Sequence, residues 1–290
     1  MIRNWIKSQP AHIVLIAINV AVFAVQSLLV VLSSLFKLRI DLFQSLFSLP
    51  SHFSEFILRP WSLFSYMYLH GNFMHLFWNM LFLFFLGKIF EQTFGRRTTF
   101  QMYHIGGLFA GLVYFVSYQV FPLFQGLDNH VLVGASGAIY AVVSGICLAR
   151  SNMQIAFFGV IKIPLILLLI FYLLSDLSNF LSSNTGGHLT HIAGAGFGIW
   201  FALKMNRGVN ILLPVARFFD KFKWKKKRKT NMKVVYSKKV KSMNDDEYNY
   251  TQKANEQKLN DILDKISKSG YDSLSKSEKE FLNFMSGHGK

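Results

Sequence analysis

One serine of this chain stands where a reactive hydroxyl could be used. Ser136 follows Gly134 and Ala135 and opens an uncharged apolar run that ends at Arg150. The small residues on either side, Gly134 and Gly137, leave room for a second backbone to approach. A serine becomes a nucleophile when a neighbouring base takes its proton and nearby donors hold the oxyanion. The same pattern also fits helix packing inside a membrane, where small and hydroxyl residues line contacts between helices.

A candidate base lies further along the chain. His191 precedes Gly194 and Gly198, which form a small-residue face that lets another helix approach closely. If the helix opened by Ser136 packs there, the imidazole of His191 reaches the serine hydroxyl and can act as its general base. Tyr140, one turn below Ser136, would then stack on the imidazole and fix its orientation.

Candidate donors for an oxyanion hole precede both residues. His75 and Asn79 are four residues apart in an apolar stretch, so they share one helical face. Both side chains donate hydrogen bonds and neither carries a negative charge, which suits charge that develops only in the transition state. The alternative is that these polar groups hold helices together.

The spacing favours a Ser–His dyad over a triad. Asp176 and Glu91 are the carboxylates within apolar segments, at depths that need not match that of His191. The competing site is a metal or haem centre built from two histidine pairs, at 70 and 75 and at 188 and 191. Their spacing resembles neither HExxH nor a Cys/His finger, and no carboxylate accompanies them. The prediction is no metal and no organic cofactor.

The composition predicts a chain that crosses a membrane. It is 52% hydrophobic with 30 Phe, and the mean hydropathy is positive. A helix spans a bilayer with about 20 apolar residues, and six segments qualify: 12–36, 72–95, a stretch within 98–127, 136–150, 163–181 and 188–203. The expected fold is an all-α polytopic membrane protein with six transmembrane helices. The fourth segment is short, which would leave Ser136 below the membrane surface.

Charge sets the predicted orientation. Basic residues at 3–7, 96–97 and 150–162 and in the tail fall on one side of six spans, which places both termini in the cytoplasm. Of the net charge of +16, eleven charges lie after residue 203, so the main body is not expected to bind nucleic acid. The run Lys221–Lys229 would lie against anionic headgroups, or act only as a stop-transfer signal.

The expected organisation has four parts: a cytoplasmic N-terminus at 1–11, a six-span domain at 12–205, a basic cytoplasmic linker at 206–253 and a C-terminal helical hairpin at 254–290. In the hairpin, Gly270 ends the first helix. Ser275 and Glu278 form a capping-box pattern that opens the second. The hairpin carries no catalytic constellation, and its partner is unknown. An interaction or regulatory role is expected.

Taken in order, these residues resemble the rhomboid family of intramembrane serine proteases. The resemblance covers about residues 55–205 and rests on four ordered motifs: Arg59-Pro-Trp61; His70, His75 and Asn79; Gly134-Ala-Ser136-Gly137 with Tyr140; and His191-Ile-Ala-Gly194 with Gly198. It implies a six-helix core with a water-filled cavity open to the outside. The tail resembles those appended to rhomboids of the Bacteroidetes group.

The resemblance also implies a role for each motif residue. Ser136 matches the nucleophile and His191 the general base. The oxyanion hole matches the side chains of His75 and Asn79 with the backbone N–H of Ser136. His70 matches a structural position, and Glu91 matches a carboxylate that anchors the second span. Residues 37–71 match a loop half-sunk in the outer leaflet, with one departure: Ser62 follows Trp61 where many members have arginine.

The resemblance therefore implies a serine endopeptidase of a bacterial inner membrane. It would hydrolyse peptide bonds in or near transmembrane segments of membrane-protein substrates. One alternative is a catalytically silent rhomboid-like protein that binds client transmembrane helices; this chain keeps both Ser136 and His191, which argues against it. The other is a histidine-rich membrane protein that binds metal or haem.

Overall fold

The structure, a computed structural model, describes residues 2–37, 42–125, 130–157, 161–181, 184–215 and 245–286. The chain divides into two compact units, Met1–Trp224 and Lys225–Lys290. The basic run Lys221–Lys229 and most of the linker predicted at 206–253 lie outside the described residues.

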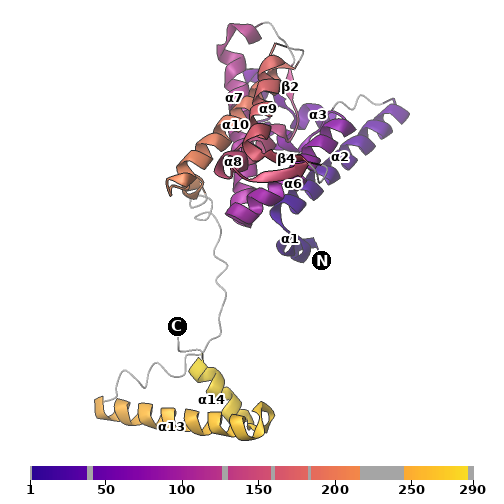
Figure 1. The fold of residues 1–290 in the computed structure, drawn as a ribbon. Helices are drawn as coiled ribbons and strands as arrows, with labels where there is room; N and C mark the ends of the chain where they lie inside the picture. Colours follow the sequence, from indigo (N-terminus) through magenta and orange to yellow (C-terminus); the bar gives the residue numbers. More distant parts are fainter. Residues whose placement is uncertain are drawn as a thin grey trace. The chain divides into compact units, whose positions relative to one another are not determined.

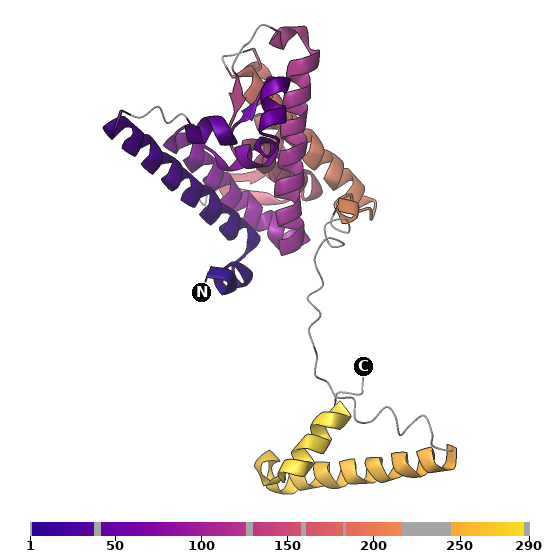
Figure 2. The ribbon, with the colours of Figure 1, turned by 180° about the vertical axis from the view of Figure 1, so that it is seen from behind.

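The first unit is built mainly on helices of 7 to 25 residues (Figure 1). They are α1 (Ile2–Ser8), α2 (Ala11–Leu35), α6 (Phe73–Phe94), α7 (Arg96–Val120), α8 (Ser136–Ala149), α9 (Leu165–Ser178) and α10 (Thr185–Asn206). The short helix α8 is central and packs against α6, α7, α9 and α10. α2, indigo in Figure 2, lies at the margin and packs against α6 and α7. The helix that begins with Ser136 is therefore the most enclosed of the set.

Two of these helices, α2 and α6, are long and apolar enough to cross a membrane by length and composition. α8 and α9 are apolar but have only 14 residues each. The chain is thus a mostly helical protein with apolar helices suited to a membrane. Six crossings remain a prediction.

The close contact between α8 and α10 depends on glycine. A Cβ on Gly194 would overlap the carbonyl oxygen of Gly137, and one on Gly198 would overlap the carbonyl oxygen of Ala141. The Ser144 hydroxyl donates to the carbonyl of Ala195 at 2.9 Å across the same contact. The helix approach that the glycine spacing predicts is therefore confirmed.

Between α2 and α6 the chain forms short elements: α3 (Leu42–Phe47), β1 (Leu49–Pro50), α4 (Phe53–Leu58), α5 (Ser62–Ser65) and the 3₁₀ helix η1 (Tyr66–Tyr68). The Tyr66 hydroxyl donates to the carbonyl of Gly107 at 2.7 Å, which ties this segment to α7. Arg59 pairs with Glu55, and the indole N–H of Trp61 donates to the carbonyl of Leu46 at 2.9 Å. The segment predicted as a loop is therefore folded.

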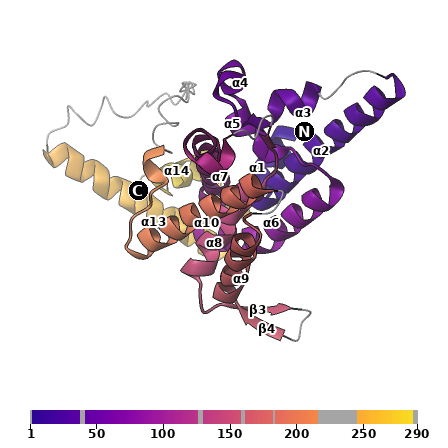
Figure 3. The same cartoon turned by 90° about the horizontal axis from the view of Figure 1, so that it is seen from above.

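The described residues are mostly helical, as the all-α prediction requires, but they also include four short strands that the sequence did not predict. β1 pairs antiparallel with β2 (Val131–Leu132), and β3 (Gln154–Phe157) pairs antiparallel with β4 (Ile161–Pro164). The second pair forms a hairpin beside α9 (Figure 3). Ile155 and Ile163 are β-branched and face each other in register, a pairing that favours strands over loop.

The second unit is a helical hairpin of α13 (Asp245–Ser269), the 3₁₀ helix η3 (Tyr271–Ser273) and α14 (Lys276–Ser286). Gly270 follows α13 with φ +77°, a conformation that favours glycine. The predicted capping box is confirmed, since the N–H of Ser275 donates to Glu278 Oε2 at 2.6 Å and the N–H of Glu278 donates to Ser275 Oγ at 3.3 Å. α13 begins at Asp245, upstream of the predicted start at 254. The prediction started late because the first turns of this helix are polar and show no apolar period.

We expect the hairpin to be acid-sensitive through Glu278. The N–H of Ser275 and the ammonium of Lys265 lower the pKa of this carboxyl from 4.5 to about 2. Because the folded-state pKa is the lower one, ionised Glu278 stabilises the hairpin above pH 4.5, and this contribution is lost as the pH falls to about 2. Glu278→Gln should therefore speed amide hydrogen exchange in α14 at neutral pH in the full chain. The exposed neighbour Glu280 provides the control: Glu280→Gln with equally fast exchange would contradict the stabilising role of the Glu278 charge.

Candidate active site

Ser136 is the first residue of α8 and follows a glycine turn. Gly134 has φ +131°, a conformation that side chains rarely adopt. Its N–H donates to the carbonyl of Tyr66 at 3.0 Å. A Cβ there would also lie 2.7 Å from Cε1 of His75. Glycine at 134 is therefore required both by the backbone turn and by the ring beside it.

The serine hydroxyl and the histidine ring are in hydrogen-bond contact. Ser136 Oγ lies 2.8 Å from His191 Nε2. The ring of Tyr140 stacks on the imidazole of His191, with centroids 4.4 Å apart and planes 10° apart. The two residues come from α8 and α10, whose backbones meet at Gly137 and Gly194. This geometry permits direct proton transfer from the hydroxyl to the ring.

Asp176 lies against this pair, and the expectation of a dyad without a carboxylate therefore misses a contact. Its Oδ1 lies 2.8 Å from Nδ1 of His191 and 2.8 Å from Nδ1 of His188. The physical reason is the connection between α9 and α10. Asp176 is close to the end of α9 at Ser178, and His191 is in the second turn of α10, so the chain reversal between them brings both to similar depth.

Backbone donors converge at the start of α8. The first N–H groups of a helix have no acceptor within the helix, and its dipole places partial positive charge there. The N–H of Ser136 is one of these donors, because the helical hydrogen bonds begin with the N–H of Ile139 to the carbonyl of Ala135. The position beside Ser136 Oγ thus suits a developing oxyanion.

The two side-chain donors occupy different surroundings. His75 lines the same cavity as Ser136 and His191. Asn79, one turn further along α6, lines a smaller cavity with Tyr140. Its Nδ2 is buried and has no hydrogen-bond partner within the described part of the chain. Such an unused buried donor is rare in proteins and is found at catalytic sites as well as where a water or ion binds.

The cavity beside Ser136 has a volume of about 410 Å³ and is partly open. Asn72 lines it and accepts the N–H of His75 at 2.8 Å, so this N-cap orients the first turn of α6. Asn72 was missed from the sequence, although an asparagine just before an apolar helix is a recognisable capping signal. Its place beside His75 makes it part of the site.

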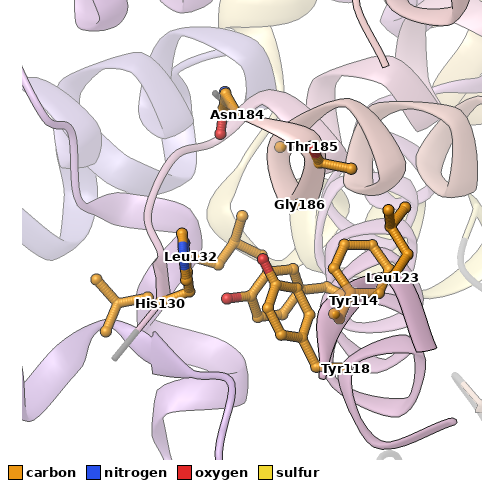
Figure 4. Close-up of a pocket in the computed structure, with 11 residues that line it drawn as sticks. Tyr114, Tyr118, Leu123, His130, Leu132, Asn184, Thr185 and Gly186 are labelled. Carbon is orange, nitrogen blue, oxygen red and sulfur yellow. The ribbon is translucent and has the colours of Figure 1, made fainter. Parts of the chain in front are cut away.

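A second cavity of about 340 Å³ adjoins the first. The two share Leu132 and Asn184 among their lining residues. Figure 4 shows the rings of Tyr114 and Tyr118, from α7, facing the segment that carries His130 and Leu132. The cavity beside Ser136 therefore borders a pocket with aromatic and polar walls.

The remaining site candidates, His70 and Glu91, do not line the cavity beside Ser136. The backbone of His70 pairs with the side chain of Gln26 in α2, and its ring stands 5.2 Å from that of His75. Glu91 accepts the N–H of Ala11 at 2.8 Å and the ring N–H of His12 at 2.7 Å. Glu91 therefore ties α6 to the first turn of α2.

Among the described residues, one group has the ligand types of a metal site. The donor atoms of Asp176, His188 and His191 lie within 4.8 Å of one another. A carboxylate does accompany this histidine pair, contrary to the sequence expectation. The same atoms already form the hydrogen bonds described above, and these account for their closeness.

Comparisons with known proteins place this chain among relatives. Residues 58–207 match the model of the rhomboid domain, and residues 244–288 match a family of unknown function, DUF6576. The chain is 36% identical over 83 residues to RHOMBOID-like protein 5 of Arabidopsis thaliana. That alignment covers 29% of this chain and 25% of the relative, so the chain matches about a quarter of the relative's length.

Fold and site together define an apolar, mostly helical domain in which a serine at a helix start meets a histidine beside a cavity. The rhomboid match extends over more than half of the 290 residues. The chain belongs to the rhomboid family.

Proposed function

We propose that this protein is an intramembrane serine endopeptidase. It hydrolyses peptide bonds in or near the transmembrane segments of membrane-protein substrates. One observation carries the proposal: Ser136 Oγ lies 2.8 Å from His191 Nε2, and both residues line an open cavity. The family match supports it, because both residues fall within the matched domain.

The reaction follows from the positions of these groups. Ser136 Oγ attacks the carbonyl carbon of the substrate while His191 Nε2 takes the hydroxyl proton. The oxyanion accepts hydrogen bonds from the N–H of Ser136 and the side chains of His75 and Asn79. His191 then gives its proton to the leaving amine, and an acyl-enzyme remains. Water attacks this ester with the same base, which releases the second product and restores Ser136.

The membrane arrangement in this proposal has six spans: α2, α6, α7, α8, α9 and α10. The 14 residues of α8 extend about 21 Å, whereas the hydrocarbon core is about 30 Å thick. Ser136 therefore lies below the outer surface, in reach of water. Both termini face the cytoplasm of a bacterium, within residues 1–11 and after 205, and the run Lys221–Lys229 binds anionic headgroups of the inner membrane.

Favoured substrates carry residues that weaken a helix near the cut. A regular helix hides its peptide groups in internal hydrogen bonds, so a carbonyl must be freed before Ser136 can reach it. Glycine and proline lower the free energy needed for that local unwinding. The hairpin at 254–290 takes no part in this chemistry and serves an interaction or regulatory role.

Covalent labelling tests the proposal. A fluorophosphonate probe should modify the purified wild-type chain at Ser136, as located by peptide mass spectrometry. Loss of the base in His191→Ala should suppress that labelling, since the hydroxyl alone is a weak nucleophile. A wild-type chain that takes up no label, although folded, would refute the protease function and favour a silent rhomboid-like protein that binds client helices.

Removal of one oxyanion donor should slow the reaction without weakening substrate binding. We expect Asn79→Ala to lower kcat by about 10²–10³-fold and to leave KM nearly unchanged, because the oxyanion exists only in the transition state. Steady-state cleavage of a reporter in detergent measures both constants. Thr93 provides the control: it lies at the other end of α6 and its hydroxyl bonds only within that helix. Equal losses in Asn79→Ala and Thr93→Ala would contradict the donor role.

A further inference from the structure

Among the residues that the structure describes, Asp176 is the acidic residue in hydrogen-bond contact with His191 of the candidate catalytic pair. Its side chain is 5% exposed, and its Oδ1 lies 2.8 Å from Nδ1 of His191. The other nitrogen of that imidazole, Nε2, lies 2.8 Å from Ser136 Oγ. Three side chains from α8, α10 and α9 therefore form one continuous chain of hydrogen bonds.

The hydrogen bond to Asp176 decides which nitrogen of His191 carries the proton. An ionised carboxylate only accepts hydrogen bonds, so Nδ1 of His191 is the protonated nitrogen. In the neutral ring, Nε2 is then the acceptor, as a general base for Ser136 requires. After Nε2 takes the serine proton, the ring is positively charged and in direct contact with the carboxylate, which stabilises it.

We propose that Asp176 is a positioning residue that converts the Ser136–His191 pair into a three-residue relay. It holds His191 in the tautomer that accepts a proton and stabilises the imidazolium formed during attack. This inference rests on the protease function proposed above. Asp176 does not touch the substrate and takes up no proton in the cycle.

A second histidine holds the carboxylate in place. His188 precedes His191 by one helical turn, and its Nδ1 lies 2.8 Å from the same Oδ1. Because residues three apart share a helical face, both rings reach across from α10 to α9. The His191 ring is further held by Tyr140, stacked on its face with centroids 4.4 Å apart. His188 orients Asp176, whereas Asp176 orients His191, so their loss should differ in effect.

The test compares Asp176→Asn with His188→Ala in the full chain, purified in detergent. Reporter cleavage gives kcat and KM, fluorophosphonate labelling gives the reactivity of Ser136 without a substrate helix, and thermal unfolding gives stability. Asparagine preserves size but brings no charge. We expect Asp176→Asn to lower kcat and the labelling rate by about 10²–10⁴-fold, with KM changed less than about twofold because the residue contributes only to the transition state. His188→Ala should lower kcat by less than about tenfold, since His188 acts on the serine–histidine pair through its bond to Asp176.

Each outcome separates the relay from a structural role. If Asp176→Asn keeps kcat and labelling within about threefold of the wild type, the relay is wrong while the protease function stands. If both variants lose activity only in step with their thermal midpoints, Asp176 is structural and the relay is again wrong. If a zinc chelator changes the wild-type rate, the cluster holds a metal and the relay is overturned. A wild-type chain that neither cleaves nor labels removes the proposed function itself.

Discussion

A Ser136→Ala variant is expected to release no fragment from a single-span membrane reporter that the wild-type chain cleaves. The substitution removes the oxygen that attacks the carbonyl carbon, and neither His191 nor the oxyanion donors can replace it. Catalysis that survives loss of a serine nucleophile is about 10³–10⁴ times the rate in water alone, which leaves no visible product on the time scale of a cell experiment. Immunoblots of cells that express enzyme and reporter together measure the fragment.

Ser144 supplies the matched control for this experiment. It lies in the same helix, α8, and its hydroxyl donates to the carbonyl of Ala195 in α10 at 2.9 Å. Ser144→Ala therefore removes a buried hydroxyl and about 1 kcal/mol of stability, but no reacting atom. We expect it to cleave the reporter. Equal fragment from Ser136→Ala and the wild type would exclude Ser136 as the nucleophile.

Much of the helical framework could be predicted because apolar runs end at charges or turns. The run predicted at 12–36 is helix α2, Ala11–Leu35, and the one predicted at 136–150 is α8, Ser136–Ala149. The sixth run was predicted to start at 188, but its helix, α10, starts at Thr185. The predicted start was late because the glycines at 186 and 187 are more typical of a loop than of a helix. Here tertiary contact decides: a Cβ on Gly186 would lie 2.7 Å from the ring of Tyr114, so glycine is needed inside the helix.

The candidate site was predictable where it depends on spacing within a helix, and less so where it depends on a connection. Gly194 and Gly198 identified the face of α10 that carries His191, and the contact with α8 follows. Asp176 could not be placed beside His191 from apolar length alone, because depth also depends on where the loop between α9 and α10 turns. Asp176 precedes the end of α9 by two residues and His191 follows the start of α10 by six, so counting from the loop between these helices would have placed both side chains near the same end of the helix pair.

Helical periodicity also has a limit at the oxyanion donors. His75 and Asn79 share a face of α6, as predicted, yet they line different cavities. One helical turn rises about 5.4 Å, so the two side chains meet different neighbours, and Asn79 lies beside Tyr140. A shared face therefore fixes direction but not depth. The two donors should differ in their access to solvent and in their importance for the oxyanion.

Gly194→Ala should disable the site from a distance, without touching a reacting atom. A Cβ at this position would overlap the carbonyl oxygen of Gly137 in α8. That oxygen belongs to backbone inside a helix, so it cannot move aside as a side chain would, and α8 and α10 must separate. Overpacking of this kind reduces stability by about 1–3 kcal/mol. It also pulls Ser136 Oγ away from His191 Nε2, which lie 2.8 Å apart in the native contact.

The size of the expected effect follows from the geometry of proton transfer. A misplacement of about 1 Å in a catalytic contact reduces rate by about 10²-fold, so we expect Gly194→Ala to lower reporter cleavage by at least that factor. The thermal midpoint should fall in the same preparation. Fluorophosphonate labelling of Ser136 should fall with cleavage, because both depend on the serine–histidine contact.

Gly196 provides the matched control two residues along the same helix. It is exposed, and a Cβ there would meet nothing within 4 Å. Both substitutions gain the same intrinsic helix preference of alanine over glycine, about 0.5–1 kcal/mol. Any difference between them therefore isolates the α8–α10 contact. We expect Gly196→Ala to keep full cleavage with an equal or higher thermal midpoint, whereas a Gly194→Ala chain as active and as stable as Gly196→Ala would show that the contact does not position His191.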